Sequence, residues 1–122
     1  MIERWPVLSF MWLGEEKRYV RRESRKALAT YRDVRMQHSA VTRTALYVKI
    51  VARLTGASAD GARALVRAAE RSFTEWPIER ELTFRDVVHY LCFERFSQSH
   101  DNRNWTRTSL RKVVDSEIPK DL

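Results

Sequence analysis

The side chains that could carry out catalysis or hold a metal are few, and the best group of them is Asp86, His89 and Cys92. Their three-residue spacing places them on one side of a helix. A structural zinc site needs four ligands, usually from paired motifs, and the other two histidines lack metal-type spacing. A Cys–His nucleophilic site needs an exposed thiol, whereas Cys92 lies between two apolar residues. With no glycine-rich phosphate loop either, we predict no enzyme, no catalytic residue, no metal and no cofactor.

A basic segment offers a different chemistry. Residues 17–53 hold eleven Lys or Arg against two acidic residues, a net charge of +9 in a chain whose total is +7. Such a concentration of positive charge favours a polyanionic partner or an acidic protein surface. At helical spacing most of these arginines fall on one side, opposite an apolar stripe. The predicted phosphate contacts are Arg18, Arg21, Arg22, Arg25 and Arg32.

A short motif follows this segment. Residues 51–58, Val-Ala-Arg-Leu-Thr-Gly-Ala-Ser, with Ala62 and Leu65 beyond them, resemble a helix-turn-helix unit over about twenty residues. The resemblance implies transcriptional regulation, with the second helix in the major groove and Arg63 and Arg67 as groove readers. Smaller residues replace bulky apolar ones at three positions of this pattern. Two helices joined by a glycine turn also occur in ordinary bundles, and that alternative stays open.

The first thirteen residues form an apolar, aromatic arm. Pro6 suits the first turn of a short helix, and Gly14 is predicted to end it. The arm either folds onto the chain's own core or docks on a partner or a second copy. It is too short to span a bilayer, and the single cysteine fits a reducing, cytoplasmic location. The candidate partner-binding residues are Trp5, Phe10 and Trp12.

Hydrophobic periodicity predicts the elements that position these groups. Residues 15–55 form one long or broken basic helix, with any break near residues 38–44, where the apolar phase slips. Further helices are expected at residues 58–76, 83–97 and 105–118. The helix at residues 83–97 is predicted to be central, and the helix at residues 105–118 is predicted to be weakly docked or frayed. The stripe predicted to be buried in the long helix comprises Val20, Ser24, Ala27, Tyr31, Val34, His38, Val41 and Ala45.

Together these features predict a single all-α domain, a bundle of about five helices with one long or bent basic helix and a central apolar helix. The function we expect is that of a small non-enzymatic regulatory or accessory protein that binds DNA or RNA mainly through backbone charge. The alternative is a protein–protein interaction module or oligomerising adaptor that binds an acidic partner through the aromatic arm or the arginine face. A homodimer fits either function, and a membrane partner fits neither.

Overall fold

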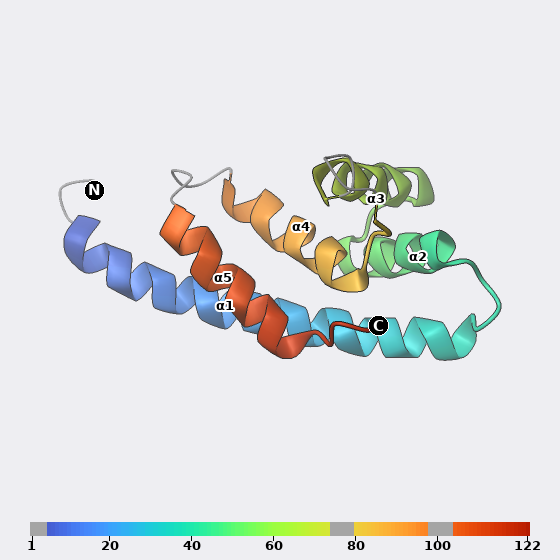
Figure 1. Cartoon of the computed structure of the whole chain (residues 1–122), viewed down its shortest axis with the longest axis horizontal. Coiled ribbons are helices and arrows are strands. Elements are labelled where there is room, and N and C mark those ends of the chain that lie inside the picture. Colours follow the sequence, from blue (N-terminus) through green and yellow to red (C-terminus); the bar gives the residue numbers. More distant parts are fainter. Residues whose placement is uncertain (1–4, 74–79, 98–103) are drawn as a thin grey trace.

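The structure is a computed structural model that describes the backbone of residues 5–73, 80–97 and 104–122 and the side chains of residues 14–73, 80–93 and 108–122. Within these ranges it contains five helices and no strand, which confirms the predicted all-α bundle (Figure 1). The helices are α1 (Trp5–Gln37), α2 (Arg43–Thr55), α3 (Ala59–Phe73), α4 (Phe84–Ser97) and α5 (Asn104–Glu117).

Helix α1 is 33 residues long and runs the length of the molecule. The prediction that Gly14 ends a separate N-terminal helix is wrong, because α1 continues through that residue. One interior glycine costs a helix about 1 kcal/mol relative to alanine, too little to stop it when good helix formers follow. The predicted stripe is buried along most of the helix, and the members exposed by 3% or less are Val20, Ser24, Ala27, Tyr31 and Val34.

The basic segment 15–55 forms two helices, separated by residues 38–42. The Thr42 side chain accepts a hydrogen bond from the Ala45 backbone N–H at 3.2 Å, which satisfies one of the first free donors of α2. After this cap the apolar phase restarts on a new face, where Leu46, Tyr47 and Ile50 are buried. The break therefore lets α2 pack back against α1.

A left-handed glycine separates α2 from α3. Gly56 has φ of +75°, and its N–H donates to the Ala52 carbonyl at 2.9 Å, closing α2. The Ser58 hydroxyl then accepts from the Gly61 N–H at 3.1 Å and caps α3. Helix α3 buries small residues against its neighbours, and the predicted continuation through residue 76 lies outside the described residues.

Helix α4 lies between α3 and α5 and also contacts α1 (Figure 1). It opens with a capping box, since the Asp86 N–H donates to the Thr83 hydroxyl at 3.1 Å and the Thr83 N–H donates to the Asp86 carboxylate at 3.0 Å. Phe84 is fully buried, with its ring centroid 4.8 Å from that of Tyr31. The predicted central apolar helix is thus the element around which α1, α3 and α5 pack.

Helix α5 lies along α1, so the prediction that it docks weakly or frays is wrong. Leu110, Val114 and Ile118 are each exposed by 1% or less. The apolar edge is narrow, as the sequence indicates, but polar contacts reinforce it. Arg85 of α4 donates to the Ile118 carbonyl at 2.7 Å, and Leu122, beyond Pro119, packs against the core.

No helix in the described ranges is both long enough and apolar enough to span a membrane.

Candidate nucleic-acid interface

The outward face of α1 carries a stripe of residues spaced four and three apart, opposite its buried stripe. Its members are Arg18, Arg22, Arg25, Ala29, Arg32 and Met36, hereafter the arginine stripe. All four arginines are exposed, and Met36 is 84% exposed. Among the described side chains, Arg18, Arg22 and Arg32 form no ion pair, and the Arg22 guanidinium lies 5.8 Å from the centroid of the Tyr19 ring.

A carboxylate from the end of α5 neutralises part of this face. The Arg25 guanidinium donates twice to Glu117, at 3.0 and 3.2 Å, and the Arg21 guanidinium lies 3.5 Å from the same carboxylate. These hydrogen bonds raise the pKa of Arg25 above its ordinary value. Sequence reasoning could not find this pairing, because ninety-two residues separate Arg25 from Glu117.

The predicted groove readers lie on α3. Arg63 pairs with Asp60 at 2.9 Å, whereas Arg67 is exposed and forms no ion pair within the described chain. Ser58 uses its hydroxyl to cap the same helix. Of the candidate groove contacts in the helix-turn-helix resemblance, Arg67 is the one whose charge has no partner among the described residues.

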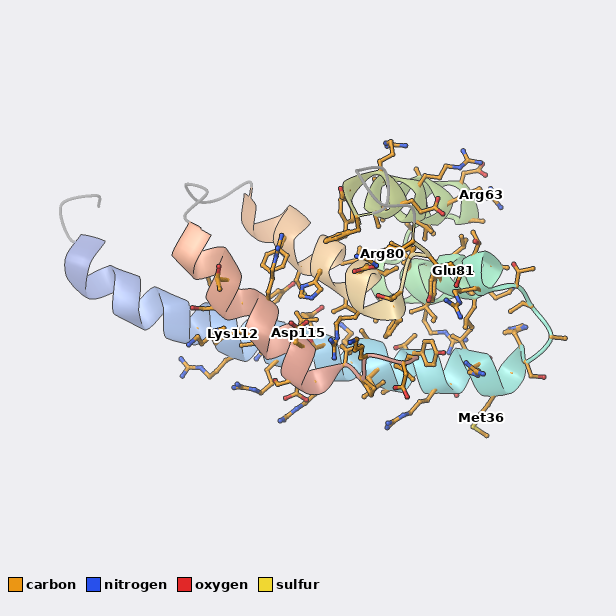
Figure 2. All side chains as sticks on the ribbon, viewed as in Figure 1. Met36, Arg63, Arg80, Glu81, Lys112 and Asp115 are labelled. Atoms are coloured by element: carbon orange, nitrogen blue, oxygen red, sulfur yellow. The ribbon has the colours of Figure 1, made fainter. Side chains whose placement is uncertain are left out.

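The two arginine rows do not share a surface. Helix α3 packs against α2 and α4 from one side, whereas α1 packs against the same two helices from the other. In Figure 2, Met36 of the arginine stripe projects from the lower edge of the molecule and Arg63 from the upper edge. One straight duplex therefore cannot contact both the arginine stripe and the predicted groove readers Arg63 and Arg67, although the sequence predicts both sets as nucleic-acid contacts.

The candidate metal ligands Asp86, His89 and Cys92 do not converge on one point, because Asp86 and His89 bind different partners. Asp86 accepts from Arg80 at 2.6 and 3.1 Å, and the Arg80 and Thr83 hydrogen bonds hold the pKa of Asp86 below its ordinary value, although burial acts to raise it. His89 Nε2 lies 2.8 Å from an Asp115 oxygen instead. Among the residues that the structure describes, no three His, Cys, Asp or Glu side chains are placed to hold a metal ion.

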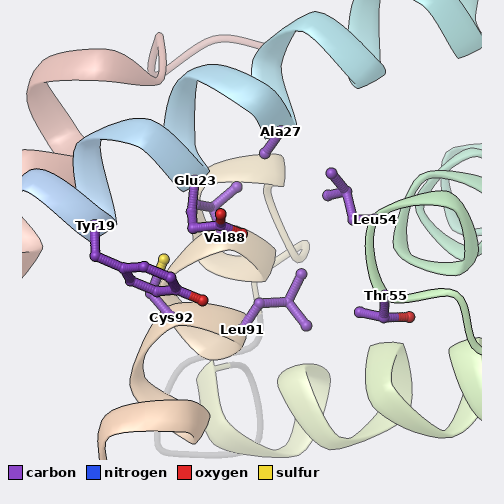
Figure 3. A pocket seen from close by; sticks show the side chains of 8 residues that line it. All are labelled: Tyr19, Glu23, Ala27, Leu54, Thr55, Val88, Leu91 and Cys92. Atoms are coloured by element: carbon purple, nitrogen blue, oxygen red, sulfur yellow. The ribbon is translucent and has the colours of Figure 1, made fainter.

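Cys92 lines a small recess where α1, α2 and α4 meet (Figure 3). The recess measures about 30 Å³, space for one or two water molecules rather than a substrate. Cys92 as a whole is only 4% exposed. A buried thiol in apolar surroundings is normally unreactive, so this geometry offers no nucleophile to a ligand in solution.

The candidate partner-binding residues Trp5, Phe10 and Trp12 belong to the first turns of α1. Their side chains lie outside the described residues. Figure 1 shows that the backbone of these turns extends beyond the ends of α4 and α5.

Comparisons with protein families, with curated proteins and with solved structures found no match to this chain.

Proposed function

We propose that this protein is a small non-enzymatic accessory or regulatory protein that binds duplex DNA or RNA through the arginine stripe of α1. One observation supports this most directly: four exposed arginines at positions 18, 22, 25 and 32 line one face of a single unbroken helix. The opposite face of that helix is buried in the bundle, so the stripe is directed away from the protein.

The dimensions suit a phosphate backbone. At 1.5 Å per residue, the span from Arg18 to Arg32 is about 21 Å, more than half a turn of duplex. The stripe itself contains no carboxylate, and the neighbouring Asp33 is paired with Arg53 of α2. Guanidinium groups can donate two parallel hydrogen bonds to a phosphate, which favours this partner over a diffuse negative surface.

The proposed contact reads charge and not base sequence. Phosphate contacts position a protein on a duplex, whereas base edges supply specificity. Arg63 and Arg67 are left out of the proposed interface, because they belong to α3, which packs on the other side of α2 and α4 from α1. We therefore expect affinity that varies little between duplex sequences and falls steeply with salt.

Fluorescence anisotropy with a random-sequence duplex at increasing salt tests the proposal. Four phosphate contacts predict a log–log slope of about −3.6, and hence about a hundredfold loss of affinity between 50 and 200 mM salt. The triple substitution Arg18→Gln, Arg22→Gln and Arg32→Gln should bring the slope to about −0.9. Undetectable binding at low salt, or binding that ignores salt, contradicts the proposal.

A matched control removes the same charge from the opposite side. Arg63→Gln, Arg67→Gln and Arg71→Gln together should leave the slope within about one contact of the wild-type value. Conversely, Glu117→Gln releases Arg25 and Arg21 from their carboxylate and should strengthen binding. If the α3 variant weakens binding as much as the α1 variant, the assignment of the interface to α1 is wrong.

The continuity of α1 favours a second candidate function. Because the apolar segment 5–13 is a direct extension of α1 and not a separate helix, it projects from the body of the molecule (Figure 1). An apolar helical extension of this kind suits docking on a partner protein or on a second copy of the chain. This is the protein-interaction module that the sequence also predicts.

A further inference from the structure

A polar pocket lies at the other end of α1, where the chain turns into α2. Its volume is about 300 Å³, at the lower end of the range for small-molecule sites. The last turns of α1, the connecting turn, the start of α2 and the final residue of the chain all contribute to its walls. The lining residues used below are Tyr31, Arg35, His38, Arg43, Tyr47 and Leu122.

The charged side chains that line this pocket are basic, and the terminal carboxylate of Leu122 is the acidic group on the same wall. Arg35 and Arg43 line it together with the imidazole of His38, and no Asp or Glu belongs to the lining. Arg43 contacts Glu81 at 2.8 Å, but this carboxylate is 80% exposed. Exposed ion pairs contribute little free energy, so Arg43 can exchange Glu81 for a bound anion.

Hydroxyl groups complete the polar lining. The Tyr31 hydroxyl accepts a hydrogen bond from Arg35 at 2.7 Å, which fixes that guanidinium beside the pocket and leaves its other N–H groups for a ligand. The Tyr47 hydroxyl donates to the Leu82 carbonyl at 3.4 Å. Burial raises the pKa of Tyr47 to about 12, so it carries no negative charge at neutral pH.

Side chains, and not helix dipoles, determine the potential here. The negative end of α1 and the positive end of α2 both adjoin the pocket, and their opposite contributions offset each other. The two guanidinium groups come from different helices, Arg35 from the end of α1 and Arg43 from the start of α2, so a compact oxyanion in the pocket can contact both. Beside them, Val41 and Leu46 offer apolar surface to the group that carries the anion.

We propose that this pocket binds a phosphate monoester, held by the guanidinium groups of Arg35 and Arg43. A doubly charged phosphate monoester matches two cations better than a carboxylate does, and it presents enough acceptors for both guanidinium groups and a hydroxyl. The pocket is separate from the arginine stripe, because Arg35 and Arg43 are not members of it. The proposal therefore does not depend on nucleic-acid binding.

Titration with inorganic phosphate and with phenyl phosphate, at ionic strength held constant with chloride, tests the site. Two-dimensional amide NMR of the full chain should show saturable shifts clustered in residues 31–47. Arg35→Gln and Arg43→Gln should each weaken phosphate binding about tenfold or more, since each removes charge-assisted hydrogen bonds. Arg63→Gln, which removes a distant charge of the same kind, should leave the affinity unchanged.

Two further measurements distinguish this site from the arginine stripe and identify the source of the phosphate. The Arg18, Arg22 and Arg32 triple variant should bind phenyl phosphate normally even if it no longer binds duplex. A single-stranded oligonucleotide that binds only when 5′-phosphorylated would place a strand end in the pocket, and indifference to that phosphate would assign the pocket to free monoesters. The proposal is overturned if phosphate shifts the amide signals no more than chloride does. It is also overturned if Arg35→Gln leaves the affinity for phosphate unchanged.

Discussion

Single residues show how this bundle accommodates polar groups inside its core. His89 is only 7% exposed, and its Nε2 lies 2.8 Å from Asp115 while its ring stacks on Phe93 at 5.7 Å. The other ring nitrogen, Nδ1, is buried and has no hydrogen-bond partner among the residues that the structure describes. This arrangement joins α4 to α5, so the histidine that could suggest chemistry in the sequence has a structural role.

The environment of His89 predicts how stability depends on pH. Burial lowers the pKa of His89 below its ordinary value of 6.5, although Asp115 acts to raise it. As the pH falls below about 6.5, the imidazole of His89 therefore becomes protonated in the unfolded chain before it does so in the folded protein. The free energy of unfolding should then decrease by up to about 1.4 kcal/mol per pH unit, until the pH reaches the pKa of His89 in the folded protein. Urea denaturation at pH values from 8 to 5 measures this slope.

The control replaces the titrating group. His89→Gln should lower stability at neutral pH but flatten the dependence between pH 5 and 7, whereas His38→Gln, at a half-buried site, should retain it. The carboxylate of Asp86 does not interfere, because its pKa is lowered and its contribution is lost only at much more acidic pH. If the free energy of unfolding depends on pH equally in the wild-type protein and in His89→Gln, His89 is not the group responsible for that dependence.

At the scale of helices, two glycines of the same chain have opposite roles. Gly14 lies inside α1 with open space around the position of an added Cβ. Gly56 ends α2 with φ of +75°, a conformation that strains any residue with a Cβ. Gly14→Ala should therefore stabilise α1 by about 0.5–1 kcal/mol. Amide exchange in the first turns of the helix should become slower as a result. Gly56→Ala should destabilise the domain by about 1 kcal/mol.

Hydrogen exchange by mass spectrometry, with urea denaturation for the global change, distinguishes the two variants. A stabilising effect of Gly56→Ala would mean that the α2–α3 turn adopts another backbone conformation. Faster exchange around residue 14 in Gly14→Ala would mean that α1 does not pass through this position.

Local signals explain how much of each helix the sequence could predict. The buried stripe of α1, the Thr42 cap and the Thr83–Asp86 capping box depend on residues a few positions apart, and their patterns are visible in the chain. The passage of α1 through Gly14 was missed because a glycine weakens a helix without forbidding it. The firm docking of α5 was missed because Arg85 and the Ile118 carbonyl meet only in the folded structure.

At the scale of the whole molecule, composition identified the charge but not its geometry. The arginine stripe follows from helical periodicity, whereas its separation from Arg63 and Arg67 depends on α2 and α4 lying between the two rows. The pocket of about 300 Å³ combines Tyr31 with Leu122, which are too far apart in the chain for any spacing rule. Local patterns thus predicted the elements and one charged face, and the remaining features required tertiary contacts.

The path of α1 leads to a prediction about assembly. Deletion of residues 1–13 leaves α1 with the segment that carries its buried stripe, from Val20 onward. The shortened chain should therefore fold and keep the cooperative thermal unfolding of the bundle. If the apolar extension joins two copies, sedimentation should show a dimer for the full chain and a monomer for the shortened one.

The full-length variant Trp5→Ser, Phe10→Ser and Trp12→Ser should behave like the shortened chain, because self-association through an apolar helix depends on these large side chains. Loss of folding on deletion would instead show that residues 1–13 belong to the core, and an unchanged mass would remove the extension from the candidate interfaces.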